Sequence, residues 1–108
     1  MRLENAVAGM LLKHVHFLQD NAGRDVGLHY IRTKDGAEVD FAISDAGELE
    51  QMVECKLGDN KPHRGLTRFA AQFPDAEAVQ VVARLRQEEF RNSIRITDAA
   101  NWLASLSA

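Results

Sequence analysis

Residues 38–56 of the chain, EVDFAISDAGELEQMVECK, decide its fold. β-prone side chains lie on both sides of Asp45-Ala46-Gly47, and a glycine turn between two such runs is typical of a β-hairpin. Another β-prone run precedes this hairpin and is separated from it by the turn Lys34-Asp35-Gly36. The sequence therefore predicts an antiparallel meander over residues 26–57, with strands at Val26–Thr33, Ala37–Ser44 and Leu49–Leu57.

The first strand of the hairpin carries two carboxylates at alternate positions. Because successive side chains of a strand point to opposite faces, we expect Glu38 and Asp40 on one face. The apolar side chains of the same strand are expected on the other face, namely Val39, Phe41 and Ile43. An acidic face and an apolar face are thus predicted for this strand.

The second strand of the hairpin has the same alternation. Glu54 and Lys56 are expected on one face, and the side chains between and after them are expected to point into the core, namely Val53, Cys55 and Leu57. Pairing of the two strands around the glycine turn brings Asp40 close to Glu54 and Lys56. Two carboxylates and an ammonium group are therefore predicted to meet.

Such a group suits a hard divalent cation. Paired Asp and Glu oxygens are ligands for Mg²⁺ or Mn²⁺, which can also take a phosphate oxygen, and Lys56 can orient a water molecule or neutralise charge. The alternative is that Asp40, Glu54 and Lys56 form a surface ion-pair ladder, worth about 0.2 to 1 kcal/mol for each cross-strand pair. The residues alone leave both interpretations open.

Apolar side chains at helical spacing predict helices on either side of the meander. Residues 2–20 show this spacing and end near Asn21-Ala22-Gly23, which predicts an amphipathic first helix. A short second helix is expected to begin at Asn60 or Pro62 and to stop at Pro74. The order up to this point is α, β, β, β, α.

The rest of the chain predicts two more strands and a last helix. Ala78–Ala83 is nearly all apolar, as expected of a central strand, and a crossover through the second helix would make it parallel to Leu49–Leu57. Ser93–Ile96 is expected to be a fifth, edge strand, and Asp98 to cap a last helix with Trp102 on its apolar side. The predicted fold class is α/β with a mixed sheet.

Length and composition bound the class of protein. With 108 residues, 45% hydrophobic and 27% charged, the chain is expected to form one domain over residues 1–108. No apolar run approaches the ~18 residues that cross a bilayer, so we expect a cytoplasmic protein without a membrane partner. We expect the thiol of Cys55 to be buried, and Tyr30 and Trp102 to lie in the core rather than to stack on bases.

Charge is unevenly distributed along the chain. Residues 1–55 carry 5 basic and 10 acidic side chains, whereas residues 56–95 carry 8 and 5. Basic residues of the second segment are candidates for contacts with nucleic-acid phosphates, foremost those around the second helix, Lys61, His63, Arg64 and Arg68. A solvated basic face is the alternative, and for His63 it is the ordinary polarity of a helix start.

The pattern Glu38-Val39-Asp40 followed on the next strand by Glu54-Cys55-Lys56 resembles the PD-(D/E)XK nuclease superfamily. That superfamily has a restriction-endonuclease-like α-β-β-β-α-β core, here with a C-terminal helix added. The chain more closely resembles the uncharacterised C-terminal domain of prokaryotic AAA+ ATPases, through Arg2-Leu3-Glu4-Asn5 and Tyr30-Ile31-Arg32. The resemblance implies that the chain is the C-terminal fragment of a longer ATPase-type chain.

The resemblance implies a catalytic set of Asp40, Glu54 and Lys56 with Glu4, Asp40 and Glu54 as metal ligands. Val39 stands where the superfamily name has proline. Some relatives also have a glutamine followed four residues later by tyrosine. Gln72 lies in the matching helix, but alanine occupies position 76, so Gln72 receives no role.

Two functions from different classes follow. The first is a metal-dependent phosphodiesterase, as a Mg²⁺-dependent endonuclease or a nuclease-derived module that binds DNA, acting alone, as a homodimer or with an ATPase domain. The alternative is a catalytically inactive interaction module with the same fold. An exposed apolar patch around Leu12 and Val15 on the first helix would favour docking, and burial of both would remove that evidence.

Overall fold

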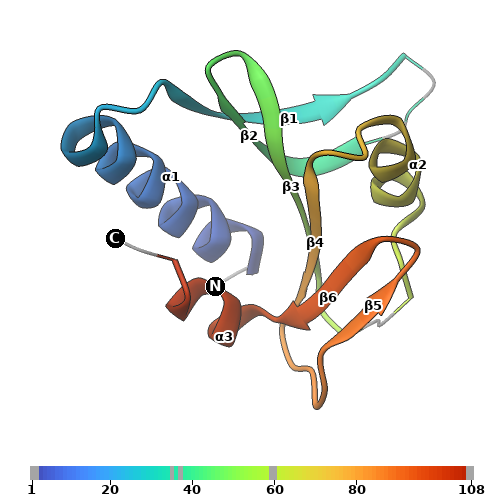
Figure 1. Cartoon of the computed structure of the whole chain (residues 1–108). Helices are drawn as coiled ribbons and strands as arrows, with labels where there is room; N and C mark the ends of the chain where they lie inside the picture. The colour runs from blue at the N-terminus through green and yellow to red at the C-terminus, as the bar shows by residue number, and fades with distance from the viewer. Residues whose placement is uncertain (1–2, 35, 37, 59–60, 107–108) are drawn as a thin grey trace.

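The computed structural model describes residues 3–34, 36, 38–58 and 61–106. These residues form three helices and a single sheet, arranged as in Figure 1, which confirms the α/β class. Four residues named in the sequence predictions lie outside the described residues, namely Arg2, Asp35 of the turn, Ala37 at a strand start and Asn60 at a helix start. The elements in chain order are α1 Leu3–Ala22, β1 Val26–Arg32, β2 Glu38–Asp45, β3 Glu48–Lys56, α2 Arg64–Gln72, β4 Glu77–Val82, β5 Glu89–Arg91, β6 Ile94–Asp98 and α3 Ala99–Ala104.

Within the described part of the chain, the sheet has six strands in the order β1-β2-β3-β4-β6-β5. β1, β2 and β3 form the predicted antiparallel meander, and β4 is parallel to both β3 and β6. The prediction of a central strand at Ala78–Ala83 is confirmed, because β4 lies between β3 and β6 and its last five residues are buried. The carboxyl ends of β3, β4 and β6 therefore lie at one edge of the sheet.

Helices cover both faces of this sheet (Figure 1). α1 and α3 lie on one face, over a core that includes Leu11, Val53 and Trp102. α2 lies on the other face, over a core that includes Met52, Leu66 and Phe69. Burial of these apolar side chains stabilises the fold, at about 1.5 to 3 kcal/mol for each large residue. Within the described part of the chain, none of the helices is both long and apolar enough to span a membrane.

A break in the regular pairing of β2 changes which side chains share a face. His29 pairs with Ala42 but Ile31 pairs with Val39, so β2 has one residue more than β1 at Asp40 and Phe41. A bulge of this kind reverses the alternation of side chains beyond it. Val39 consequently packs in the α2 core, whereas Phe41 packs against the α1 core.

Several predictions about side-chain direction are therefore corrected. Val39 does not share a face with Phe41 and Ile43, because of the bulge. Leu57 is 76% exposed rather than in the core, because it follows the end of β3. Tyr30 is 66% exposed on the outermost strand, so its core assignment is wrong, whereas the core assignment of Trp102 is confirmed at 2%.

The segment before α3 is a hairpin rather than a single edge strand. β5 and β6 are antiparallel and joined by Asn92 and Ser93, which have φ angles of 52° and 65°. Positive φ at both residues is the requirement of a two-residue type I′ turn. β5 is the edge strand, so the assignment of Ser93–Ile96 to the edge is wrong. Asp98 caps α3 as predicted, because its side chain accepts from the N–H of Asn101.

Candidate functional site

The side chains of Asp40 and Glu54 bond the main chain of each other's strand, at the point where regular pairing between β2 and β3 ends. The last main-chain pair of this ladder is Phe41 with Val53. Beyond it, the N–H of Asp40 donates to Oε1 of Glu54 at 3.1 Å, and the N–H of Cys55 donates to Oδ2 of Asp40 at 2.9 Å. One oxygen of each carboxylate thus accepts a hydrogen bond from a main-chain N–H of the neighbouring strand. The two predicted site carboxylates do lie together.

Glu54 is nearly buried, with 6% of its surface exposed. Burial is the main cause that raises its pKa to about 7, and the negative charges of Asp40 and Glu4 act in the same direction. The hydrogen bond from Asp40 N–H and the charge of Lys56 act in the opposite direction and only partly offset the rise. A buried carboxylate beside a second one is an environment that a cation would stabilise.

His63 lies against Glu54 from the start of α2. Its Nδ1 accepts a hydrogen bond from the N–H of Leu66, which makes His63 the N-cap of the helix and leaves the ring proton on Nε2. Nε2 is 3.4 Å from Oε2 of Glu54. Burial and the charge of Lys56 lower the pKa of His63, so its ring is neutral near pH 7. The sequence predicts His63 as a phosphate contact, and the structure places it beside the carboxylate pair.

Gln80 holds the segment that carries His63. It is completely buried on β4, next to Glu54 in the register of the sheet. Its side-chain oxygen accepts from the N–H of His63 at 2.8 Å, and its side-chain nitrogen donates to the carbonyl of Lys61 at 2.8 Å. The sequence signal that could have revealed it is a single amide inside an otherwise apolar strand.

Gly65 lets the start of α2 approach the sheet. A Cβ at this position would lie 2.4 Å from the carbonyl oxygen of Glu38 and 3.0 Å from Cε1 of His63. Side-chain atoms cannot occupy that space, so only glycine permits this approach without a shift of the backbone. The distance between His63 and Glu54 therefore depends on Gly65.

Lys56 and Glu4 act on the carboxylate pair through their charges. Lys56 is half-buried at the end of β3, and its charge favours the ionised form of Glu54. Glu4 is exposed in the first turn of α1, and its charge contributes to the raised pKa values of Glu54 and Cys55. Among the residues that the structure describes, no three His, Cys, Asp or Glu side chains form a group able to hold a metal ion. Glu4 as a third ligand stays a prediction.

Comparison with protein families gives a match over residues 1–102 to the family described as "Domain of unknown function (DUF4143)". The chain belongs to this family. DUF4143 is an uncharacterised domain family often found at the C-terminus of AAA-type ATPases. This confirms the predicted resemblance to the C-terminal domain of such ATPases. Neither the curated proteins nor the solved structures gave a significant match.

The DUF4143 domain exposes basic side chains around the start of α2. Lys61, Arg64 and Arg68 are all exposed, and Arg64 and Arg68 are four residues apart on one side of the helix. These are the predicted phosphate contacts other than His63. The structure leaves them at the surface next to the segment that Gln80 holds, and their binding of nucleic acid stays a prediction.

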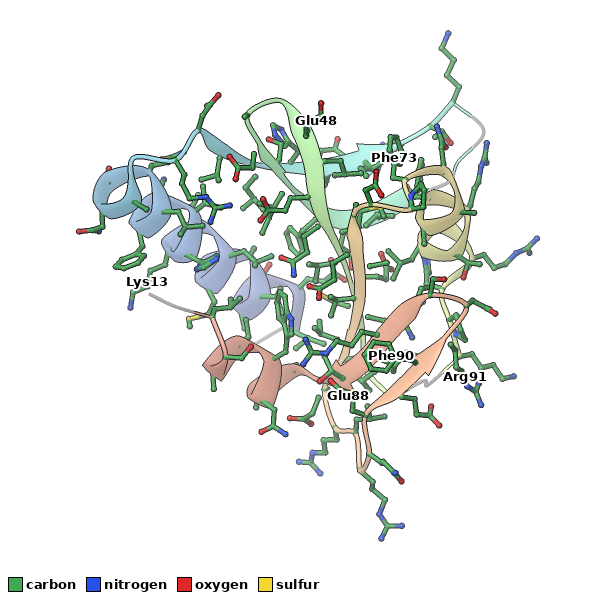
Figure 2. All side chains as sticks on the ribbon, in the orientation of Figure 1. Lys13, Glu48, Phe73, Glu88, Phe90 and Arg91 are labelled. Carbon is green, nitrogen blue, oxygen red and sulfur yellow. The ribbon has the colours of Figure 1, made fainter. Side chains whose placement is uncertain are left out.

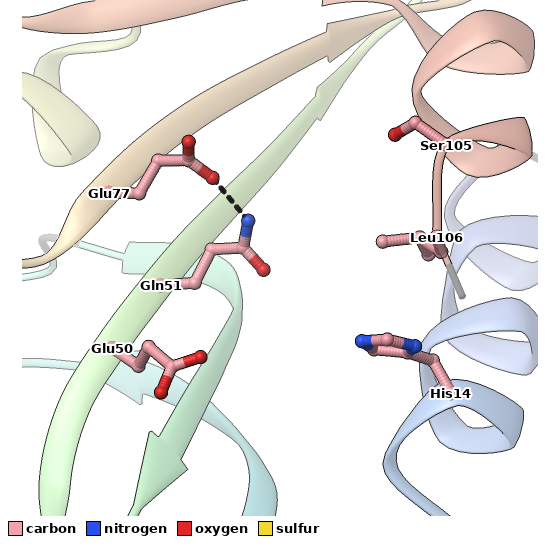
Figure 3. A pocket seen from close by; sticks show the side chains of 6 residues that line it. All are labelled: His14, Glu50, Gln51, Glu77, Ser105 and Leu106. Atoms are coloured by element: carbon pink, nitrogen blue, oxygen red, sulfur yellow. Dashed lines mark hydrogen bonds between the residues drawn. The ribbon is translucent and has the colours of Figure 1, made fainter. Parts of the chain in front are cut away.

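A second cluster of carboxylates lies at the opposite end of β3 and β4 in the DUF4143 domain. Figure 3 shows Glu50, Gln51 and Glu77 facing His14 of α1 across a pocket. The volume of this pocket is about 290 Å³. Glu77 accepts a hydrogen bond from Gln51, and Glu50 forms an ion pair with Arg24. Because both carboxylates have partners, a cation would stabilise this pocket less than it would stabilise the pair at Asp40 and Glu54.

The apolar patch proposed for docking is only half exposed. Leu12 is 46% exposed on α1, whereas Val15 is 2% exposed and packs in the core between α1 and the sheet. The two residues therefore do not form a joint surface on the DUF4143 domain. A single exposed leucine is ordinary for a protein surface.

Proposed function

We propose that this DUF4143 domain is a metal-dependent phosphodiesterase that acts on nucleic acid. The observation that carries the proposal is the pair formed by Asp40 and Glu54. Their carboxylates lie on adjacent strands, are fixed by main-chain N–H groups, and stand at the carboxyl edge of the parallel strands. Ligand sites of α/β sheets commonly lie outside the carboxyl ends of strands.

The donor set fits a hard divalent cation. Each carboxylate has one oxygen, Oδ1 of Asp40 and Oε2 of Glu54, that the main-chain hydrogen bonds between the strands do not use. Mg²⁺ is typically held in proteins by one or two carboxylates, with water and phosphate oxygens as its remaining ligands. Asp40 and Glu54 would hold Mg²⁺ or Mn²⁺, which would polarise the phosphate and lower the pKa of a bound water.

The neighbouring side chains supply the other needs of phosphodiester hydrolysis. Lys56 can bind a phosphate oxygen through its ammonium group and neutralise charge that develops in the transition state. His63 is neutral, and its Nε2 proton faces the Glu54 carboxylate at 3.4 Å, so it can fix the direction of that carboxylate. We assign His63 a positioning role for this reason.

The order of elements also supports the proposal. The α1-β1-β2-β3-α2-β4 sequence agrees with the α-β-β-β-α-β core of the PD-(D/E)XK superfamily, which the Glu38-Val39-Asp40 and Glu54-Cys55-Lys56 motifs resemble. We therefore propose membership of that superfamily for this domain. Fold resemblance alone does not assign an activity, so the proposal depends on the carboxylate pair.

A cleavage assay with matched variants tests the proposal. Single-stranded, duplex and branched DNA are incubated with Mg²⁺ or Mn²⁺ and with wild type, Asp40→Asn or Asp45→Asn. Asp45 ends the same strand and pairs with Arg24, far from Glu54 in the strand register. We expect Asp40→Asn to lose activity by about 100-fold or more, and Asp45→Asn to keep it. Equal activity of wild type and Asp40→Asn would eliminate the proposed chemistry.

A further inference from the structure

A hollow beside the carboxylate pair lies at the same edge of the sheet. Its volume is about 390 Å³, and its lining residues are Gly58, Arg84, Leu85, Arg86, Gln87 and Glu89. Gly58 is two residues beyond Lys56, and the N–H of Ala83 donates to the carbonyl of Lys56 at 3.0 Å. The hollow therefore begins directly after the strand ends that carry Glu54 and Lys56.

Two arginines of this hollow are not neutralised. Arg84 and Arg86 are exposed and form no hydrogen bond or ion pair with any residue of the described part of the chain. The arginines of the β5–β6 hairpin differ: Arg95 pairs with Glu88 at 2.6 Å, and Arg91, labelled in Figure 2, pairs with Glu89 at 3.8 Å. Unpaired guanidinium groups are suited to bidentate binding of phosphate.

Glu89 brings an acceptor to the same hollow. It lies on the α2 face of the sheet, in one register row with Ile96, Gln80 and Glu54. Its side chain is 36% exposed, whereas its Oε2 is buried, has no hydrogen-bond partner within the described residues and lies 3.8 Å from Nε of Arg91. The exposed part of this carboxylate can accept a hydrogen bond from a ligand that supplies an N–H group.

We propose that this hollow binds a nucleotide of single-stranded nucleic acid next to the phosphate held at Asp40 and Glu54. Arg84 and Arg86 bind its phosphate, and Glu89 accepts a hydrogen bond from the amino group of its base. Single-stranded nucleic acid fits better than a duplex, because unpaired bases expose the edges that Glu89 contacts. The assignment of the neighbouring phosphate rests on the proposed function, whereas binding in the hollow is independent of cleavage.

The first test measures binding of fluorescein-labelled single-stranded DNA by anisotropy in EDTA, where metal-dependent cleavage is absent. The double variant Arg84→Ala/Arg86→Ala is compared with Arg24→Ala/Arg95→Ala, which removes the same charge from arginines that have acidic partners outside the hollow. We expect the first double variant to bind about tenfold more weakly or worse, and the second to stay within about twofold of wild type. The slope of log affinity against log salt should fall by about 0.7 for the first double variant, because the two arginines share one phosphate contact.

A second test addresses Glu89. Cytosine presents an amino group, whereas thymine presents carbonyl oxygens on both sides of its single N–H, so wild type should bind oligo(dC) more tightly than oligo(dT). Glu89→Ala should remove that preference.

Equal weakening in both double arginine variants, no weakening in either, or no binding by wild type would each overturn the proposal. Asp40→Asn separates the two claims, because it should lose cleavage and keep full affinity in EDTA. A wild type that binds through Arg84 and Arg86 without cleaving DNA would refute only the proposed function.

Discussion

Glu50 and Glu54 lie four residues apart on β3 and occupy opposite environments. The Glu50 side chain is 49% exposed and pairs with Arg24 at 3.1 Å, near a pocket in which Gln51 binds Glu77. The Glu54 side chain is 8% exposed, accepts from the main-chain N–H of Asp40 and lies 3.4 Å from a neutral histidine, and the charge of the Asp40 carboxylate acts on it. One carboxylate has an arginine as its partner, and the other is buried with no cation bound directly to it among the described residues.

This difference separates a structural charge cluster from a candidate site. Exposed ion pairs such as that of Glu50 contribute about 0 to 1 kcal/mol and carry no chemistry. A buried carboxylate such as Glu54 costs stability when it is charged, and strongly perturbed groups of this kind concentrate at functional sites. Each variant that tests stability has a matched control, which lies either at the other end of β3 and β4 or in the helix over the other face of the sheet.

The largest effect on stability is expected for Gln80→Leu. The change keeps the volume but leaves the N–H of His63 and the carbonyl of Lys61 without the partner that Gln80 supplies. At about 1 to 3 kcal/mol for each such group, the free energy of unfolding should fall by about 4 kcal/mol. Urea titration measures this loss.

Gln51→Leu is the matched control for Gln80→Leu. Among the described residues, the Gln51 side chain bonds only the side chain of Glu77 in the other cluster, so its loss should cost about 1 kcal/mol or less. Equal losses in the two variants would show that Gln80 has no special part in holding the segment of His63.

The next effect concerns the pH dependence of stability. Glu54 has a pKa of about 7 in the folded protein, above its ordinary value of 4.5, so its contribution is fully present below about pH 4.5. As pH rises through about 7, that contribution is lost, at a cost of about 3 kcal/mol. Glu54→Gln should therefore gain stability relative to wild type between about pH 5 and about pH 8.

Urea titrations across this pH range measure the difference between wild type and each variant. The lowered pKa of His63 changes stability in the opposite direction, because the contribution of His63 is lost as pH falls. Wild type and variant both contain His63, so the difference in stability between them largely cancels this effect. Glu50→Gln should follow the wild-type profile within about 0.5 kcal/mol, since Glu50 is exposed. Parallel profiles for wild type and Glu54→Gln would contradict the raised pKa.

The smallest of these effects is expected for Gly65→Ala. The new methyl group would lie 2.4 Å from the carbonyl oxygen of Glu38, so α2 has to move, at a cost of about 2 kcal/mol. Gly9→Ala in α1 meets no atom within 4 Å and should instead add up to about 1 kcal/mol, from helix propensity. Thermal unfolding of both variants gives the sign, and a stabilised Gly65→Ala would contradict the close approach of α2 to the sheet.

Local patterns in the sequence predict much of the fold. Alternation and glycine turns predict the meander, the apolar run at Ala78–Ala83 predicts the central strand, and Asp98 predicts the start of α3. These features depend on residues close together in the chain. The proximity of Asp40 and Glu54 was predictable for the same reason, because a short hairpin joins their strands.

Other features depend on contacts between distant segments and were not predictable from local patterns. The bulge at Asp40 is a property of the pairing with β1, and it reverses the direction of Val39. The positive φ of Ser93 belongs to a turn that lacks glycine, so the β5–β6 hairpin carried a weak signal. The position of His63 beside Glu54 requires the bonds from Gln80 on a later strand.

Calorimetric titration with Mn²⁺ tests the central claim most directly. Wild type, Asp40→Asn and Asp45→Asn are titrated at about pH 7 in buffers of different ionisation enthalpy, so that proton release is measured together with binding. The account predicts that wild type and Asp45→Asn bind Mn²⁺ and release about half a proton for each ion, since the pKa of Glu54 is about 7. It predicts that Asp40→Asn does not bind. No binding by wild type at millimolar Mn²⁺, or equal binding by Asp40→Asn, would contradict a metal site at Asp40 and Glu54.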